Sequence, residues 1–134
     1  MTSTHVDLVK SMYEAFARGD VAAVLEKFHP EIEWNEAEHF PYADGNPYIG
    51  PDAVVTGVFQ RLMTEWDYWT LAIEEYLDAG EVVVAMGRYN SKHKASGTEI
   101  SAQFAHVWWL RDGKAVRFQQ YADTAQIAAA VQAS

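Results

Sequence analysis

Apolar residues follow two different periods along the chain, and the change of period divides it into two halves. In the first half they recur every three or four positions, which predicts amphipathic helices. The first helix is indicated by Val6, Val9, Tyr13 and Phe16. A second, short helix is expected to begin after Asp20 and to end before Pro30. A third helix opens at Pro51 and extends to Trp66.

The second half alternates between apolar and polar residues, which predicts strands. Four strands are expected, at Trp69–Leu77, Glu81–Lys94, Thr98–Arg111 and Lys114–Ala122, and a last helix follows at Ala125–Val131. An earlier strand places Trp34 and Glu36 on one face, before a loop over residues 37–49 that contains proline and glycine. Helices followed by an antiparallel meander indicate an α+β fold. Because sheets twist, we expect this sheet to curl around a pocket beneath the helices.

Asp112 and Gly113 are a strong signal for a two-residue hairpin turn, which sets an expected register for the last two strands. Counting back from this turn places His106 opposite Gln119, and opposed residues share a face. The face expected to line the pocket is large and hydrogen-bonding: Phe104, His106, Trp108, Gln119, Tyr121 and Asp123. The other face is almost wholly apolar: Ala105, Val107, Trp109, Val116 and Phe118.

That apolar face is expected to lie on the convex side of the curled sheet. A large exposed aromatic patch on a small protein usually marks an interface. We therefore expect a homodimer formed through the sheet. The alternative is that another element of the same chain covers the patch.

Composition excludes several classes of protein. The chain has 134 residues, of which 49% are hydrophobic, so a single domain over residues 1–134 can bury a core. The formal net charge of −9 leaves no cationic footprint for nucleic acid. Cysteine is absent, which excludes disulfides and thiol nucleophiles. Apolar runs are too short for a membrane span or a signal peptide, so we expect a cytoplasmic protein that binds no membrane.

Two titratable residues are candidates for catalysis. Glu36 follows Trp34 on one strand face, and a carboxylate aimed into an apolar pocket has a raised pKa that suits proton transfer near neutral pH. The alternative is one more solvated acid. His106 lies in mid-strand between aromatic residues and can donate to a substrate oxygen or carry a proton. The alternative is a core histidine that Gln119 or Tyr121 satisfies.

The rest of the expected ligand-binding wall is aromatic and polar. It comprises Trp34, Tyr48, Phe59, Met86, Phe104, Trp108, Gln119, Tyr121 and Asp123. Asp123 has an alternative role as the cap of the last helix. Arg88 either faces the pocket or lies at the surface, and the aromatic residues of the 37–49 loop either close over a ligand or pack the loop. No spacing matches a metal site, a phosphate-binding loop or a nucleotide fingerprint, so we expect neither a metal nor a cofactor.

Several stretches together resemble a known family. These are Tyr13–Asp20, Glu33-Trp34, Tyr48–Gly50 and, above all, Phe104–Trp108 with Arg111–Lys114 and Arg117–Thr124. They are similar to SnoaL-like proteins of the nuclear transport factor 2-like superfamily, which includes ketosteroid isomerases and polyketide cyclases. The resemblance implies a cystatin-like α+β cone, a deep apolar pocket and commonly a homodimer. It does not imply one reaction, because fold and function are separable.

The resemblance to ketosteroid isomerase is partial at the level of single residues. Glu36 falls at the general base of that enzyme, and His106 at the protonated aspartate that donates to the oxyanion. Met12 and Val58 replace two tyrosines, which argues against steroid isomerisation. Cyclases of the SnoaL type use a pocket aspartate from the C-terminal strand, which Asp123 can supply. Epoxide hydrolases of the superfamily need an Arg-x-Asp that this chain lacks.

Two main functions remain open, with a third beside them. The first is cofactor-free proton transfer on a small apolar molecule with a carbonyl, by Glu36 with His106 and Tyr121, in an isomerisation, cyclisation or dehydration. The second is a module that binds a small apolar ligand without chemistry. The third is a dimerisation module with a vestigial pocket.

Overall fold

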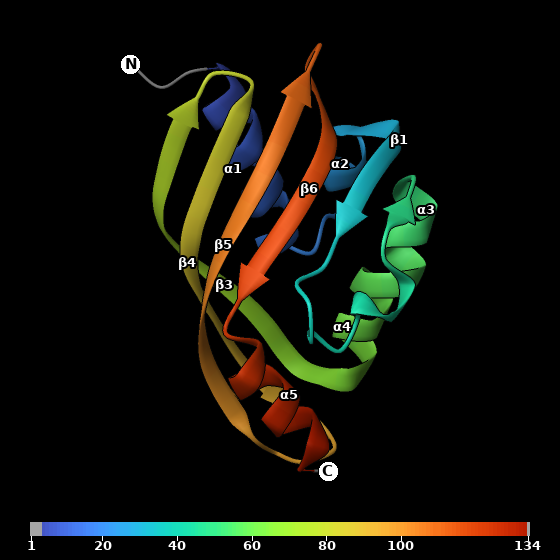
Figure 1. Ribbon diagram of the computed structural model, residues 1–134, viewed down its shortest axis with the longest axis vertical. Helices are drawn as coiled ribbons and strands as arrows, with labels where there is room; N and C mark the ends of the chain where they lie inside the picture. Colours follow the sequence, from blue (N-terminus) through green and yellow to red (C-terminus); the bar gives the residue numbers. More distant parts are fainter. Residues whose placement is uncertain (1–3, 134) are drawn as a thin grey trace.

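A six-stranded sheet organises the computed structural model, which describes residues 4–133 (Figure 1). Its strand order is β2-β1-β6-β5-β4-β3, and every neighbouring pair is antiparallel except β1 with β6, which is parallel. The strands are β1 (Phe28–Asn35), β2 (Tyr48–Ile49), β3 (Trp66–Ala79), β4 (Val82–His93), β5 (Glu99–Arg111) and β6 (Lys114–Ala122). The α+β fold and the curved sheet are as the sequence predicts.

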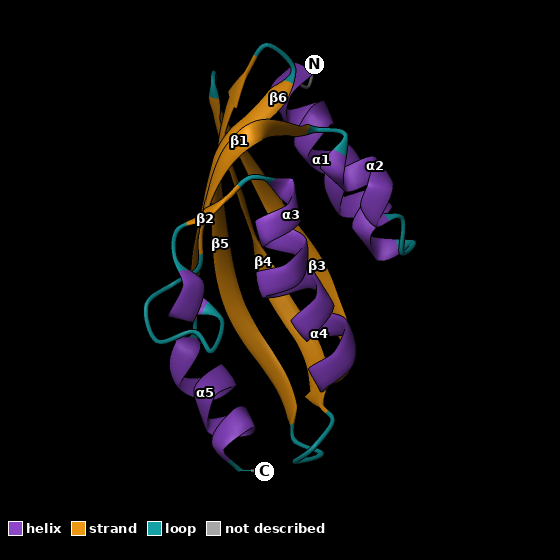
Figure 2. Cartoon of the chain, turned by 90° about the vertical axis from the view of Figure 1, so that its right-hand side faces the viewer, coloured by secondary structure: helices purple, strands orange, loops and turns teal. Residues whose placement is uncertain are grey.

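The helices before β3 lie together on one face of the sheet, whereas α5 lies at its far end (Figure 2). They are α1 (Thr4–Ala17), α2 (Val21–Leu25), α3 (Pro51–Val54), the π-helical η2 (Val55–Phe59), α4 (Gln60–Glu65) and α5 (Thr124–Gln132), with a 3-10 turn η1 (Ala43–Gly45) in the long loop. Asp20 caps α2, and Asp123 caps α5 by accepting a hydrogen bond from the backbone N–H of Gln126. No helix of the described residues is long and apolar enough to cross a membrane.

Two helix boundaries differ from the sequence prediction. Phe28 and Trp66, expected in helices, are the first residues of β1 and β3. Pro30 does not follow a helix but lies inside β1, where the pairing with β6 shifts register between Phe28 and Glu33. Proline has no N–H to donate, so it is tolerated at such an irregularity. Apolar spacing alone could not separate a helix end from a strand start there.

A β-bulge overturns the predicted register of β5 and β6. Arg111 does pair with Lys114, but the register shifts between Trp109 and Leu110, and His106 therefore lies opposite Gln120 rather than Gln119. One extra residue sends every following side chain of a strand to the opposite face. Phe118, Gln120 and Ala122 consequently share a face with Trp108, His106 and Phe104.

The convex face of the sheet therefore has a different composition from the one expected. Phe118 is not on it: its side chain is 1% exposed and stacks on Trp34 with 3.8 Å between ring centroids. Trp109 remains on the convex face, with the Arg117 guanidinium 4.5 Å above its ring. Tyr121, expected in the pocket, is 57% exposed. The helices before β3 leave this face uncovered (Figure 2).

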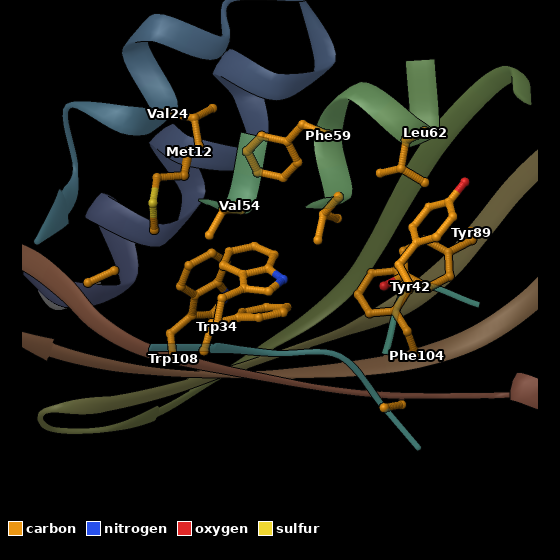
Figure 3. Close-up of a cluster of buried hydrophobic side chains, with 14 of the residues drawn as sticks. Met12, Val24, Trp34, Tyr42, Val54, Phe59, Leu62, Tyr89, Phe104 and Trp108 are labelled. Atoms are coloured by element: carbon orange, nitrogen blue, oxygen red, sulfur yellow. The ribbon is translucent and has the colours of Figure 1, made fainter. Parts of the chain in front are cut away.

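The core lies between the concave face of the sheet and the helices, and it is strongly aromatic (Figure 3). Trp34 and Trp108 meet edge-on with 5.7 Å between centroids, and Phe59 packs on Trp34 from the helical layer at the same distance. Protein interiors are normally close-packed, so an open space among these rings is a candidate site.

Candidate functional site

An apolar cavity opens between the helices and the concave face of the sheet. Its volume is about 60 Å³, whereas one water molecule needs roughly 10–15 Å³, so it has room for a few waters or a small molecule. Most of its wall is apolar: Met12, Phe16, Val24, Trp34, Phe40, Val58, Phe59, Leu62, Trp69, Leu71, Trp108 and Phe118. Five polar side chains complete it: Tyr13, Glu36, Tyr89, His106 and Gln120.

Among residues 4–133, Glu36 is the one carboxylic acid on the wall of this cavity. It follows the end of β1, and Asn46 fixes its backbone from across the loop: the Glu36 N–H donates to Asn46 Oδ1 at 2.9 Å, and Asn46 Nδ2 donates to the Glu36 carbonyl at 2.8 Å. Its side chain is 3% exposed. The backbone clamp holds the carboxyl inside although its charge favours water.

Burial raises the pKa of the Glu36 carboxyl to about 8. The indole N–H of Trp34 and the positive charge of Arg61 oppose this increase in pKa. At pH 7 about one Glu36 carboxyl in ten is therefore ionised, and the remainder carry a proton. Such a group takes and returns protons within the physiological range.

Trp34 adds an unused hydrogen-bond donor beside this acid. Its Nε1 is buried and makes no hydrogen bond of good geometry within residues 4–133, although it lies near enough to the Glu36 carboxyl to lower the pKa of that group. A buried N–H without a partner costs free energy, which makes it a good donor for whatever enters the cavity. The cavity therefore offers a proton-exchanging acid and an indole N–H from two residues that are two positions apart in one chain segment.

His106 is enclosed by tyrosines. The Tyr13 hydroxyl lies 2.6 Å from Nδ1 and the Tyr89 hydroxyl 2.5 Å from Nε2. Trp108 Nε1 donates to the Tyr13 hydroxyl at 2.9 Å, and Gln120 Nε2 donates to the Tyr89 hydroxyl at 2.8 Å. Burial lowers the pKa of His106 to about 3, so the ring is neutral at physiological pH. Burial also raises the pKa of both tyrosines, which keeps their hydroxyls protonated.

The loop between β1 and α3 is attached to α4 by a polar cluster. Arg61 makes a two-pronged contact with Asp44, at 2.8 and 3.1 Å, and lies over the Tyr42 ring at 4.1 Å. Tyr48 donates to the Tyr42 carbonyl at 2.6 Å. Phe40, held by this arrangement, forms part of the cavity wall. The loop therefore closes one side of the cavity.

The structure brings five of the residues singled out from the sequence to one cavity. They are Glu36, His106, Trp34, Phe59 and Trp108. Phe104 lies behind the wall, stacked on His106 at 4.2 Å and on Tyr89 at 4.4 Å. Tyr48 does not line the cavity; its hydroxyl donates to the Tyr42 carbonyl and holds the loop.

Four other expected ligand contacts lie outside the cavity. Met86 is opposite Ala105, in the alternate set of β4 and β5 residues that points away from His106. The bulge turns Gln119 and Tyr121 to the outer face, where they border an open depression together with Asn46. Asp123 caps α5. Arg88, left open by the sequence, donates to the Ser101 carbonyl away from the cavity.

Sequence reasoning missed Tyr13, Tyr89 and Gln120. Tyr89 shares the inward face of β4 with Ala85 and Gly87, whose small size made the outward Val84 and Met86 look like the buried set. Gln120 was missed because the register expected without the bulge places it on the outer face. Tyr89 packs against Trp69 and Phe104, which lie diagonally from it on the two neighbouring strands, and a polar residue among aromatic ones is the signal that could have been used. Among residues 4–133 no group of three or more acidic, histidine or cysteine side chains could hold a metal ion.

The family model of the SnoaL-like domain matches residues 9–118. This chain belongs to the SnoaL-like domain family. No protein with a curated description matches it. The matched range contains four of the five polar residues of the cavity and ends before Gln120.

Solved structures agree with that assignment. A nuclear transport factor 2-like protein from Burkholderia thailandensis is 37% identical to this SnoaL-like domain, with a TM-score of 0.91 over 98% of this chain and 99% of that one. TerC, crystallised with polyporic acid, is 26% identical, with a TM-score of 0.86 over 97% and 99%. A putative SnoaL-like polyketide cyclase from Jannaschia is 15% identical, with a TM-score of 0.82 over 100% and 98%, and shares the fold.

Proposed function

We propose that this SnoaL-like domain transfers a proton on a small, uncharged organic molecule with a carbonyl group, and that Glu36 is the proton-transferring residue. The observation that carries the proposal is the buried Glu36 carboxyl on an apolar cavity wall, with its pKa raised to about 8. A carboxylate is normally too weak a base for a C–H bond next to a carbonyl. Desolvation strengthens it.

The proposed reaction begins with ionised Glu36. Its carboxylate takes the proton from the carbon next to the carbonyl, and the electron pair of that C–H bond moves to the carbonyl oxygen, which forms an enolate. Buried hydrogen-bond donors stabilise the oxygen as its charge develops. With an unsaturated ketone, Glu36 then returns the proton to the far carbon of the conjugated enolate, the carbonyl forms again and the double bond has moved, which completes an isomerisation. With a second carbonyl in the same molecule, the enolate carbon attacks that carbonyl carbon, its π electrons move to its oxygen, and this oxygen takes the proton from Glu36, which closes a ring.

The wall of the cavity supports an uncharged, flat substrate. No lysine or arginine is among the residues that line it, so a carboxylate or phosphate would lose its hydration without gaining a partner. Trp34, Phe59 and Trp108 offer aromatic faces to a flat ring. TerC was crystallised with polyporic acid, which supports an organic ligand for this fold and does not bear on the charge of a ligand here.

Proton transfer is tested by hydrogen–deuterium exchange in deuterated water. Cyclohexenone, indanone and tetralone are incubated with the protein, and NMR follows the loss of signal from the carbon next to the carbonyl. At least one ketone is expected to exchange faster with the wild type and with Glu38→Gln, an exposed control acid, but not with Glu36→Gln. Exchange no faster than in buffer, for ketones whose binding is seen by ligand NMR, contradicts the proposal and favours the binding-module alternative.

We also propose that the convex face forms a homodimer. Within the described part of the chain, Val84, Met86, Val107 and Trp109 lie on this face only partly buried, and no helix before β3 covers them. Trp109→Lys places a charge where a partner would desolvate it, which costs several kcal/mol. Sedimentation of the wild type as a dimer and of this variant as a monomer is expected. A wild type that is monomeric at micromolar concentration contradicts this second proposal.

A further inference from the structure

The hydrogen-bond donors and acceptors around the His106 ring can be counted, because the chemistry of each neighbouring group limits what it can donate and accept. A neutral imidazole has one N–H, which donates, and one bare nitrogen, which accepts. Tyr13 and Tyr89 are the two partners of the ring, at Nδ1 and Nε2. Each tyrosine hydroxyl can donate one hydrogen and accept two hydrogen bonds.

Both hydroxyl oxygens already accept a hydrogen bond from elsewhere. Tyr13 accepts from Trp108 Nε1, and an indole nitrogen is a donor only. Tyr89 accepts from Gln120 Nε2. The Gln120 amide cannot be reversed, because its Oε1 accepts from the backbone N–H of Ala37 at 3.1 Å. The directions of these two hydrogen bonds are therefore settled.

One tyrosine hydrogen must then be left over. The bare nitrogen of His106 accepts the O–H of one tyrosine. The ring N–H donates to the oxygen of the other, which now accepts twice and keeps its own hydrogen free. The same count holds for either tautomer, and both tyrosines line the cavity. The free hydrogen belongs to Tyr89 if His106 carries its proton on Nε2, and to Tyr13 if the proton is on Nδ1.

Tyr89 is the tyrosine on the side of the acid. Its hydroxyl is linked through Gln120 to the backbone of Ala37, the residue that follows Glu36. After burial as the largest cause, the negative charge of Glu36 contributes to the raised pKa of Tyr89, and it is not among the causes of the raised pKa of Tyr13. A donor on this side reaches the oxygen of a molecule whose adjacent carbon faces Glu36.

We propose that Tyr89 donates its free hydroxyl hydrogen to the substrate oxygen, and that His106 is a positioning residue that keeps this hydrogen free by holding its own proton on Nε2. This assignment rests on the proposed proton transfer and replaces the direct role expected for His106. Because the imidazole N–H is used by Tyr89, it does not reach the substrate.

The tautomer of His106 is the first test, and it needs no substrate. Proton–nitrogen correlation spectra of nitrogen-labelled protein distinguish an N–H at Nε2 from one at Nδ1. We expect the Nε2–H form in the wild type. Tyr89→Phe removes the acceptor of that N–H and is expected to shift the proton to Nδ1, where Tyr13 accepts it. A wild type with the proton on Nδ1 overturns the assignment of Tyr89.

The second test uses para-nitrophenol, whose coloured phenolate is an oxygen anion that the free hydroxyl should bind. Tyr89→Phe and Tyr13→Phe delete the same atom from opposite sides of one ring and form a matched pair. A hydrogen bond to a charged acceptor contributes about 1.5–3 kcal/mol, so we expect Tyr89→Phe to weaken phenolate binding roughly tenfold or more. Tyr13→Phe is expected to weaken it much less. An equal loss in both variants, or a larger loss in Tyr13→Phe, overturns the proposal.

The outcomes separate this proposal from the proposed function. If the Nε2–H tautomer and the selective effect of Tyr89→Phe are found but no ketone exchanges, the oxygen-binding role holds and the proton-transfer proposal fails. If Glu36 catalyses exchange and Tyr89→Phe leaves the exchange rate unchanged, the proton transfer holds and the role of Tyr89 fails. Circular dichroism first verifies that each variant is folded, so that a loss of binding or of exchange is not caused by unfolding.

Discussion

The Glu36 and His106 sides of the cavity both bury a titratable group, but they treat it in opposite ways. His106 has a partner at each ring nitrogen, and those partners are themselves hydrogen-bonded. Glu36 is held by its backbone, whereas its carboxyl lies beside an indole N–H that makes no hydrogen bond of good geometry within residues 4–133. Burial raises the pKa of the acid and lowers that of the histidine, so both groups are mainly neutral near pH 7.

This difference teaches which buried group is available for chemistry. A satisfied polar network is rigid and defines one arrangement of the core. An acid whose carboxyl is near only one donor, the Trp34 indole N–H, exchanges protons with whatever occupies the cavity beside it. We therefore assign proton transfer to Glu36 and positioning to His106, whose network leaves one tyrosine hydroxyl hydrogen free for the substrate oxygen. The following predictions test that division, from the largest expected effect to the smallest.

The largest effect is expected for the Glu36 side, in the pH dependence of ketone exchange. Because only ionised Glu36 acts as a base, the rate is expected to rise nearly tenfold per pH unit below pH 8 and to level off above it. From pH 6 to pH 9 this is on the order of a hundredfold. Glu36→Gln is expected to lose about 10²–10⁴-fold at the plateau. A rate that is flat over this range contradicts the role of Glu36.

Folding stability is expected to depend on pH with opposite signs for the two groups. Glu36 has a raised pKa: between about pH 4.5 and 8 the unfolded chain releases a proton that the folded chain keeps, so stability falls as pH rises. His106 has a lowered pKa: between about pH 6.5 and 3 the unfolded chain binds a proton that the folded chain does not, so stability falls as pH falls.

Each group can change stability by at most about 1.4 kcal/mol per pH unit within its window. Urea unfolding of the wild type and of Glu36→Gln from pH 5 to pH 9 measures the first effect. The variant is expected to be the more stable protein at pH 9, and the difference should shrink towards pH 5. A constant difference across this range would show that the Glu36 carboxyl is hydrated in the folded protein.

The His106 side is expected to respond to truncation through stability. His106→Ala opens a cavity and removes a partner from two buried tyrosines, which we expect to cost about 2–5 kcal/mol in urea unfolding at pH 7. The control is His39→Asn at an exposed loop position, because asparagine tolerates the positive φ of 70° found there. The control is expected to change stability by about 0.5 kcal/mol or less. If the two variants lose equally little folding stability, the hydrogen-bond network around His106 does not stabilise the core.

The smallest effect is expected for the indole beside the acid. Trp34→Phe keeps an aromatic ring and deletes the N–H that opposes the increase in the Glu36 pKa. The midpoint of the pH profile for ketone exchange is therefore expected to move to higher pH, by a fraction of a pH unit. An unchanged midpoint would mean that this N–H does not act on the carboxyl, and a shift to lower pH would contradict the stated cause.

The sequence was sufficient for the fold and for part of the site. The change of apolar period predicted the helices and the four long strands, and Glu36 and His106 were assigned to one cavity. The bulge at Trp109 and Leu110 was not predictable, because the hairpin signal at Asp112 and Gly113 fixes only the turn. A single added residue moved Gln119 and Tyr121 out and Gln120 in.

The hydrogen-bond partners of His106 are far from it in the sequence, so no local sequence pattern predicts them. Tyr13 lies 93 residues before His106 in the chain, and its contact with the imidazole exists only because α1 packs across the sheet. The direction of the Gln120 amide is likewise fixed by a backbone N–H in the loop after β1. These contacts follow from packing among aromatic rings rather than from periodicity.

The most direct test of the central claim is a titration of the Glu36 carboxyl by carbon NMR. Glutamate-labelled wild type and Glu36→Gln are compared from pH 3 to pH 10, and the side-chain carboxyl resonance absent from the variant is followed. We predict a midpoint near 8, the value to which burial raises the pKa of Glu36. A midpoint near 4.5, the ordinary value for glutamate, would show a hydrated carboxylate and contradict the assignment of chemistry to this side of the cavity.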